Sequence, residues 1–141
     1  MKKLFTFILL SLIGMSSLFA QSPIRVACIG NSVTYGYGHR NPKITSYPTR
    51  LGQMLGSEYE IRNFGHSGAT LLNHGHRPYT QQQAFQEALA YAPDKAIIHL
   101  GLNDTDPRNW PNYRDEFIPD YLALIDTLRA VSCELSHQLL D

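Results

Sequence analysis

Apolar positions along this chain fall into two kinds of pattern, one typical of strands and one typical of helices. Residues 24–29 and 95–100 are short, mostly apolar runs, each closed by a glycine, as in strands buried on both faces of a sheet. Residues 58–64 alternate polar with apolar side chains, which is the period of a strand with one buried face. We therefore predict three strands.

Three further segments have apolar residues spaced three or four apart, which predicts amphipathic helices. They are residues 47–55, 81–91 and 112–131. Gly56 suits the end of the first helix, and Pro119 predicts a kink within the third.

Strands and helices therefore alternate along the chain, which predicts an α/β fold with a parallel sheet and right-handed crossovers. Such sheets bind ligands at the carboxyl ends of their strands. A segment rich in glycine and polar residues follows each predicted strand directly: residues 30–36, 63–70 and 101–104. We expect these segments to meet at one edge of the sheet.

Each segment offers one group suited to acyl transfer. Ser32 supplies a hydroxyl on a tight turn after the first strand, where a nucleophile is exposed. Gly68 has no side chain to keep a substrate oxygen away from its backbone N–H. Asn103 supplies an amide donor of the kind found in oxyanion holes. Taken singly, such residues are more often turn or cap residues, and only their combination points to acyl transfer.

The motifs in these segments resemble a known family. Gly-Asn-Ser at 30–32, Asn-x-Gly-x-Ser-Gly at 63–68 and Gly-x-Asn-Asp at 101–104 resemble the first three sequence blocks of the SGNH, or GDSL-type, hydrolases. The resemblance spans roughly residues 24–131. It implies a flavodoxin-like three-layer α/β/α fold, of which about three of five strands are present here.

By the same resemblance, Ser32 is the catalytic nucleophile, Gly68 the backbone oxyanion donor and Asn103 the side-chain oxyanion donor. Asn31 stands where the family most often has Asp, which removes a charge beside the nucleophile.

Three longer segments, residues 63–70, 74–79 and 99–110, resemble the N-terminal esterase domain of secreted bacterial sialate O-acetylesterases. This implies a substrate that is a glycan ester carrying acetyl groups. We expect His66, Asp104 and Arg77 to contact that substrate.

A serine esterase needs a base, which in this family is the His of a late Asp-x-x-His block. Here Glu134 and His137 imitate that block, but one helix after the third strand must carry them to the opposite end of the sheet. We expect no base in this chain, and residues 132–141 read as an atypical tail left by a truncation or frameshift. His66, His74 and His76 have no accompanying carboxylate at useful spacing, so we expect neither a metal nor another cofactor.

The N-terminal sequence and the composition indicate where the protein is located. Residues 1–20 combine two lysines, an apolar stretch and small residues up to Ala20, which predicts a signal peptide, with a membrane anchor as the alternative. We expect a secreted or periplasmic protein without membrane attachment after cleavage. The 141 residues carry twelve basic and twelve acidic side chains, and this balance argues against nucleic acid as a partner. Of the two cysteines, Cys28 falls in a strand and is predicted to be a buried thiol.

Residues 21–131 are thus interpreted as the N-terminal part of a hydrolase domain that removes acetyl groups from glycans. Two alternatives stay open: an inactive fragment, or a non-catalytic glycan-binding module. For the second, the candidate aromatic platforms are Tyr35, Tyr37, Tyr79 and Trp110.

Overall fold

The computed structural model describes the backbone of residues 22–138 and the side chains of residues 22–132. The predicted signal peptide, the Cys133 side chain and the His137 side chain lie outside these ranges. Among the described residues, no helix has the length and apolar character that crossing a membrane requires.

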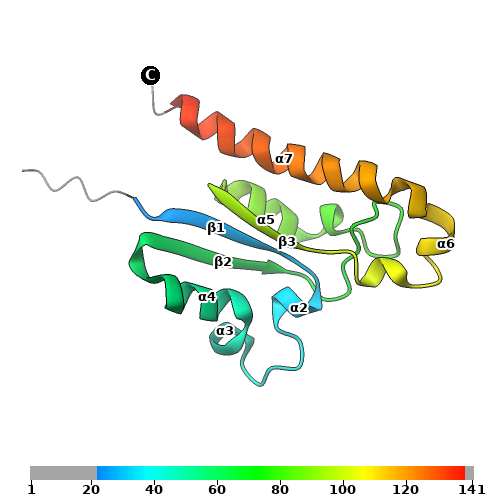
Figure 1. Cartoon of the computed structure of the whole chain (residues 1–141), viewed down its shortest axis with the longest axis horizontal. Coiled ribbons are helices and arrows are strands. Elements are labelled where there is room, and N and C mark those ends of the chain that lie inside the picture. The colour runs from blue at the N-terminus through cyan, green and yellow to red at the C-terminus, as the bar shows by residue number, and fades with distance from the viewer. Residues whose placement is uncertain (1–21, 139–141) are drawn as a thin grey trace, which may run out of the picture.

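Three parallel strands form the sheet, in the order β2-β1-β3 (Figure 1). They are β1 (Ile24–Gly30), β2 (Tyr59–Gly65) and β3 (Lys95–His99). Gly30 at the end of β1 lies in register with Gly65 on one side and His99 on the other. The three strands therefore end at the same level, and the segments that follow them start from one edge.

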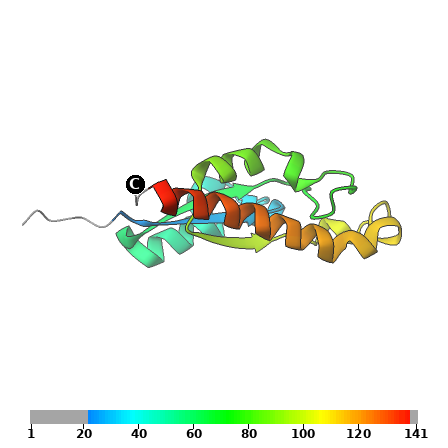
Figure 2. The same ribbon diagram turned by 90° about the horizontal axis from the view of Figure 1, so that it is seen from above.

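The helices are α2 (Ser32–Tyr35), α3 (Pro42–Thr45), α4 (Tyr47–Leu55), α5 (Gln83–Tyr91), α6 (Trp110–Tyr113) and α7 (Phe117–Gln138). Seen from above, α4 and α5 lie on opposite faces of the sheet (Figure 2). The sequence thus predicted the alternation of elements correctly, and the predicted α/β fold is confirmed.

The main core lies between the sheet and the layer formed by α5 and α7. Ala27 and Ile29 of β1 are fully buried and belong to one cluster with Phe85 of α5 and Leu124 and Leu128 of α7. The alternate β1 residue Cys28 is also fully buried, and Tyr47 at the start of α4 is close enough to affect the pKa of its thiol. Burial on both faces explains why β1 is almost continuously apolar. The prediction that Cys28 is a buried free thiol is confirmed.

Two predictions about the later elements were wrong. Residues 95–100 were expected to be a strand buried on both faces, but β3 is largely exposed, with Ile97 retaining 39% of its accessible surface. Among residues 22–138, only β1 pairs with β3, so one edge of this strand has no neighbour. Pro119 does not interrupt a helix, because α7 begins at Phe117 and the proline falls in its first turn. A first-turn residue has no intrahelical partner for its N–H, so proline is tolerated there.

Candidate active site

Ser32 is the first residue of α2 and follows directly on β1. The Asn31 side chain caps this helix, because its Oδ1 accepts a hydrogen bond from the N–H of Val33 at 3.0 Å. Asn31 is fully buried. Its amide oxygen caps the helix without placing a carboxylate in a buried position. An Asn at position 31 is therefore compatible with the local geometry of the turn that carries Ser32.

Gly30 lets α2 pack directly on the end of the sheet. A Cβ at this position would lie 2.7 Å from the carbonyl oxygen of His99 and 2.8 Å from Cβ of Thr34. Any side chain would therefore push the Ser32 turn away from β3.

Backbone hydrogen bonds hold the three strand-end segments together. The N–H of His66 donates to the Gly30 carbonyl at 2.8 Å, and the N–H of Asn31 donates to the His99 carbonyl at 3.3 Å. The Asn103 side chain joins the segment after β3 to the segment after β2, since its Nδ2 donates to the Ala69 carbonyl at 2.8 Å. These bonds tie the segments carrying Ser32, Gly68 and Asn103 to one another.

Gly68 has a φ of +81°, a conformation that favours glycine. Arg77 lies against it, with Nη1 donating to the Ser67 carbonyl at 3.0 Å. The Ser67 carbonyl and the Gly68 N–H belong to one planar peptide group. By holding the carbonyl, Arg77 fixes the direction in which the N–H points and polarises it as a donor. Arg77 thus supports the Gly68 peptide group, and the expectation that it also contacts substrate stays a prediction.

Asp104 was also expected to contact substrate, but it is completely buried. Its two carboxylate oxygens accept the backbone N–H groups of Leu71 at 3.0 Å and Leu72 at 2.7 Å. A carboxylate with no exposed surface cannot contact a ligand at the surface of the protein. Asp104 therefore acts as a clamp between the segment after β2 and the segment after β3.

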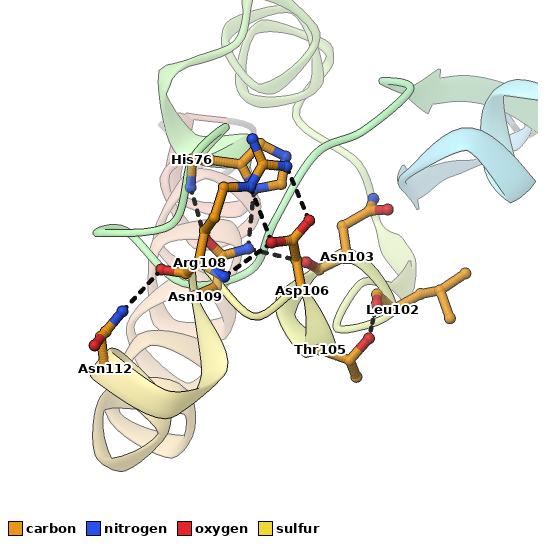
Figure 3. A network of polar contacts seen from close by, with 8 residues as sticks. All are labelled: His76, Leu102, Asn103, Thr105, Asp106, Arg108, Asn109 and Asn112. Carbon is orange, nitrogen blue, oxygen red and sulfur yellow. Dashed lines mark hydrogen bonds and ion pairs between the residues drawn. The ribbon is translucent and has the colours of Figure 1, made fainter.

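Asn103 has one amide hydrogen left for a ligand. A side-chain amide carries two N–H groups, and the bond to Ala69 uses only one of them. Within residues 22–132 the second has no partner. Figure 3 shows the Asn103 side chain pointing away from the Asp106–Arg108 pair. This geometry is compatible with a pinned amide that can still donate to an oxyanion.

A polar network supports the backbone around Asn103 (Figure 3). Asn109, only 1% exposed, donates through Nδ2 to the Asn103 carbonyl at 2.9 Å. Its Oδ1 accepts the N–H of His76, and its Nδ2 lies 2.9 Å from Nδ1 of the same histidine. Sequence reasoning missed Asn109, because a buried asparagine in a loop leaves no periodic signal. Beside it, hydrogen bonds from the Arg108 side chain and N–H hold the pKa of Asp106 well below its usual range.

No histidine partner for the Ser32 hydroxyl is present in the described part of the chain. His66 is half-buried beside the Gly68 segment, and its imidazole makes no hydrogen bond within residues 22–132. His74 pairs instead with Glu116 at 2.7 Å, and this hydrogen bond raises its pKa. Those residues contain no group of three or more His, Cys, Asp or Glu side chains placed to hold a metal ion.

The direction of α7 bears on the expected position of His137. The Ser132 hydroxyl donates to the Pro93 carbonyl at 2.6 Å, just before β3 begins. The C-terminal part of α7 thus lies beside the starting end of the sheet, opposite the edge that carries Ser32 (Figure 1). The α7 backbone runs away from Ser32.

Comparison with known proteins agrees with this geometry. Residues 28–136 match the model of the GDSL-like lipase/acylhydrolase family. The chain belongs to this family. Over 109 residues it is 45% identical to an acetylxylan esterase of Xylanibacter ruminicola, an alignment that covers 77% of this chain and 22% of the relative. The chain thus spans less than a quarter of that relative's length, and no solved structure matches it.

Proposed function

We propose that this GDSL-family chain carries the nucleophile and the oxyanion hole of an esterase that removes acetyl groups from glycans. The observation that supports this most strongly is the joining of three segments at one sheet edge by the His66–Gly30, Asn31–His99 and Asn103–Ala69 hydrogen bonds. These bonds tie together the three segments that carry the Ser32 hydroxyl, the Gly68 N–H and the Asn103 amide.

In the proposed reaction, the Ser32 oxygen attacks the acetyl carbonyl carbon. The carbonyl oxygen becomes an oxyanion that accepts hydrogen bonds from the Gly68 N–H, the Ser32 N–H and Asn103 Nδ2. Collapse of this intermediate expels the sugar hydroxyl and leaves acetyl-Ser32, which water then hydrolyses. The base that takes the serine proton comes from outside the described residues.

The name of the relative and the resemblance to sialate O-acetylesterases both favour an acetylated glycan as substrate. His66 and the exposed Arg77 remain candidates for a substrate contact among the three expected, whereas Asp104 is buried with both carboxylate oxygens used. We also propose export from the cytoplasm, on the signal-like sequence of residues 1–20.

A rate measurement tests the proposal. We expect slow hydrolysis of p-nitrophenyl acetate that Ser32→Ala abolishes, while Ser57→Ala, at an exposed serine away from the site, has no effect. Because no histidine among residues 22–132 is bonded to Ser32, the Ser32-dependent rate is expected to rise with hydroxide concentration and to increase with added imidazole. Equal rates in the Ser32→Ala variant and the parent would refute the nucleophile assignment. A plateau near pH 7 would instead indicate that a histidine of this chain acts as the base, and would contradict the expected hydroxide dependence.

A glycan-binding module without catalysis is the second candidate, supported by the exposure of Tyr35, Tyr37 and Trp110. Tyr79 was expected to be a fourth platform, but it is 1% exposed and its hydroxyl donates to the Phe64 carbonyl, so it cannot stack on a sugar. Glycan binding with no Ser32-dependent acetyl release would favour this second candidate.

A further inference from the structure

A hollow of about 390 Å³ lies next to the nucleophile turn, between α2, the α3–α4 segment and the end of β2. Tyr35, Arg40, Lys43, Ser46, Thr49 and Asn63 are among the residues that line it. Tyr35 lies three residues after Ser32 in α2, and side chains at this spacing are neighbours on one helix face, about 5–6 Å apart at Cβ. A ligand in this hollow would therefore be close to a group that reacts at Ser32.

The hollow is positively charged. Arg40 and Lys43 both line it, whereas no Asp or Glu does. Neither cation makes an ion pair with any side chain of residues 22–132, although five other arginines in that range pair with a carboxylate: Arg25, Arg62, Arg108, Arg114 and Arg129. Two unneutralised cations facing one hollow favour an anionic ligand.

Hydrogen bonds hold the wall of the hollow in place. Asn63 Nδ2 donates to the Thr34 carbonyl at 2.7 Å and lies 3.4 Å from Oγ of the buried Ser46. Thr49 Oγ1 lies 3.2 Å from the same Oγ and donates to the Lys43 carbonyl at 3.1 Å. The backbone that carries Lys43 is thus fixed to α4.

Tyr35 adds an apolar surface at the edge of the hollow. Tyr35 retains 48% of its accessible surface. A tyrosine ring has an apolar face and a polar hydroxyl, and both can contact a sugar ring. Arginine can bind a carboxylate with two parallel hydrogen bonds, and lysine acts as a point charge.

We propose that this hollow is a subsite for a carboxylate-bearing sugar residue in the acetylated glycan. The carboxylate lies between Arg40 and Lys43, the sugar ring lies against Tyr35, and a neighbouring acetyl ester is thereby presented to Ser32. The inference rests on the proposed function and gives it a substrate class, an acidic glycan. The acid group can come from a uronic acid side group or from a sialic acid.

Titration calorimetry on the full 141-residue chain tests this proposal. The ligands are a glucuronic-acid-substituted xylo-oligosaccharide, sialyllactose and an unsubstituted xylo-oligosaccharide of the same length as the first. We expect at least tenfold tighter binding of one acidic ligand than of the neutral one, weakening as salt is raised. Which acidic ligand binds better identifies the source of the carboxylate.

The double variant Arg40→Gln/Lys43→Gln is expected to bind acidic and neutral ligands equally. The control Arg50→Gln/Lys95→Gln removes the same charge from positions outside the hollow and is expected to keep the preference. Equal binding of acidic and neutral ligands by the parent chain would overturn the proposal, as would a preference unchanged in the Arg40/Lys43 variant. Inorganic phosphate binding as tightly as the acidic oligosaccharide would also overturn it, since the sugar would then contribute nothing.

These outcomes are separable from failure of the proposed function. Binding does not require Ser32 chemistry, so the preference for acidic ligands is expected to survive in Ser32→Ala. Ser32-dependent acetyl release without any preference would remove the subsite alone. A preference without acetyl release would remove the esterase proposal and leave an acidic-glycan site.

Discussion

At the scale of single residues, the proposed oxyanion donors are supported groups rather than free ones. The Gly68 N–H shares its peptide group with a carbonyl held by Arg77, and the Asn103 amide is pinned to the Ala69 carbonyl. Donors fixed in advance need no reorganisation when charge develops on the substrate oxygen, which is the source of their effect in catalysis. Changes in their supports should therefore affect the reaction more than the fold.

Replacing Arg77 tests this support. Arg77→Met is expected to lower the rate of Ser32 acylation by p-nitrophenyl acetate about tenfold, because a charge-assisted hydrogen bond contributes about 1.5–3 kcal/mol. Arg77→Lys keeps the charge and is expected to recover part of the rate. Thermal unfolding should change little, because Arg77 is exposed. Full activity in Arg77→Met would contradict a positioning role.

Burial of Cys28 predicts a dependence of stability on alkaline pH. Burial raises the pKa of this thiol to about 11 from a reference value of 9.0. The folded state thus keeps a proton that the unfolded state loses, so stability is complete below pH 9 and falls as the pH rises from 9 to 11.

Urea unfolding at pH 8 and pH 10.5 measures this loss. Tyr79, whose pKa is also raised by burial, contributes in the same direction. The Cys28→Ala variant should therefore show a smaller loss than the parent, and an equal loss in both would contradict the assignment.

At the scale of elements, the site is assembled by connections between the loops that follow β2 and β3. Asp104 is the main one, since a residue just after β3 accepts two backbone N–H groups from the segment after β2. The sequence predicted that these segments meet, because parallel strands end at one edge. It did not predict the clamp, because an Asp in a Gly-x-Asn-Asp motif looks the same whether it faces a ligand or a neighbouring loop.

Asp104→Asn tests the clamp. The amide nitrogen cannot accept a hydrogen bond, so one buried N–H of Leu71 or Leu72 loses its partner. We expect unfolding in urea to show a loss of about 1–3 kcal/mol. Asp106→Asn, at the partly exposed carboxylate paired with Arg108, is the control and should cost less. A smaller loss in Asp104→Asn than in this control would contradict the clamp.

At the scale of the whole molecule, hydrophobic patterns predicted the bounds of helices and strands well, because these depend mainly on neighbouring residues in the sequence. The bounds of α4 match the predicted helix at 47–55, and β1 and β2 differ from prediction by one residue at their ends. The predictions that failed concern contacts between residues far apart in the sequence. The burial of β3 depends on what lies beside it, which its apolar sequence cannot tell. Asn109 hydrogen-bonds to His76, which lies 33 residues away in the sequence, and Arg77 to Ser67, which lies 10 residues away. Neither partner can be recognised from the local sequence.

The proposed reaction requires Ser32 to be a nucleophile beside preorganised oxyanion donors. Incubation with p-nitrophenyl acetate followed by peptide mass spectrometry tests this assignment, since no histidine among residues 22–132 is bonded to Ser32 and acetyl-Ser32 should therefore be hydrolysed slowly enough to accumulate. We predict one acetyl group on Ser32, formed about 10²–10³-fold more slowly in Asn103→Ala and absent in Ser32→Ala. Acetyl groups distributed over surface lysines and serines, with none favoured at Ser32 and no effect of Asn103→Ala, would contradict the account.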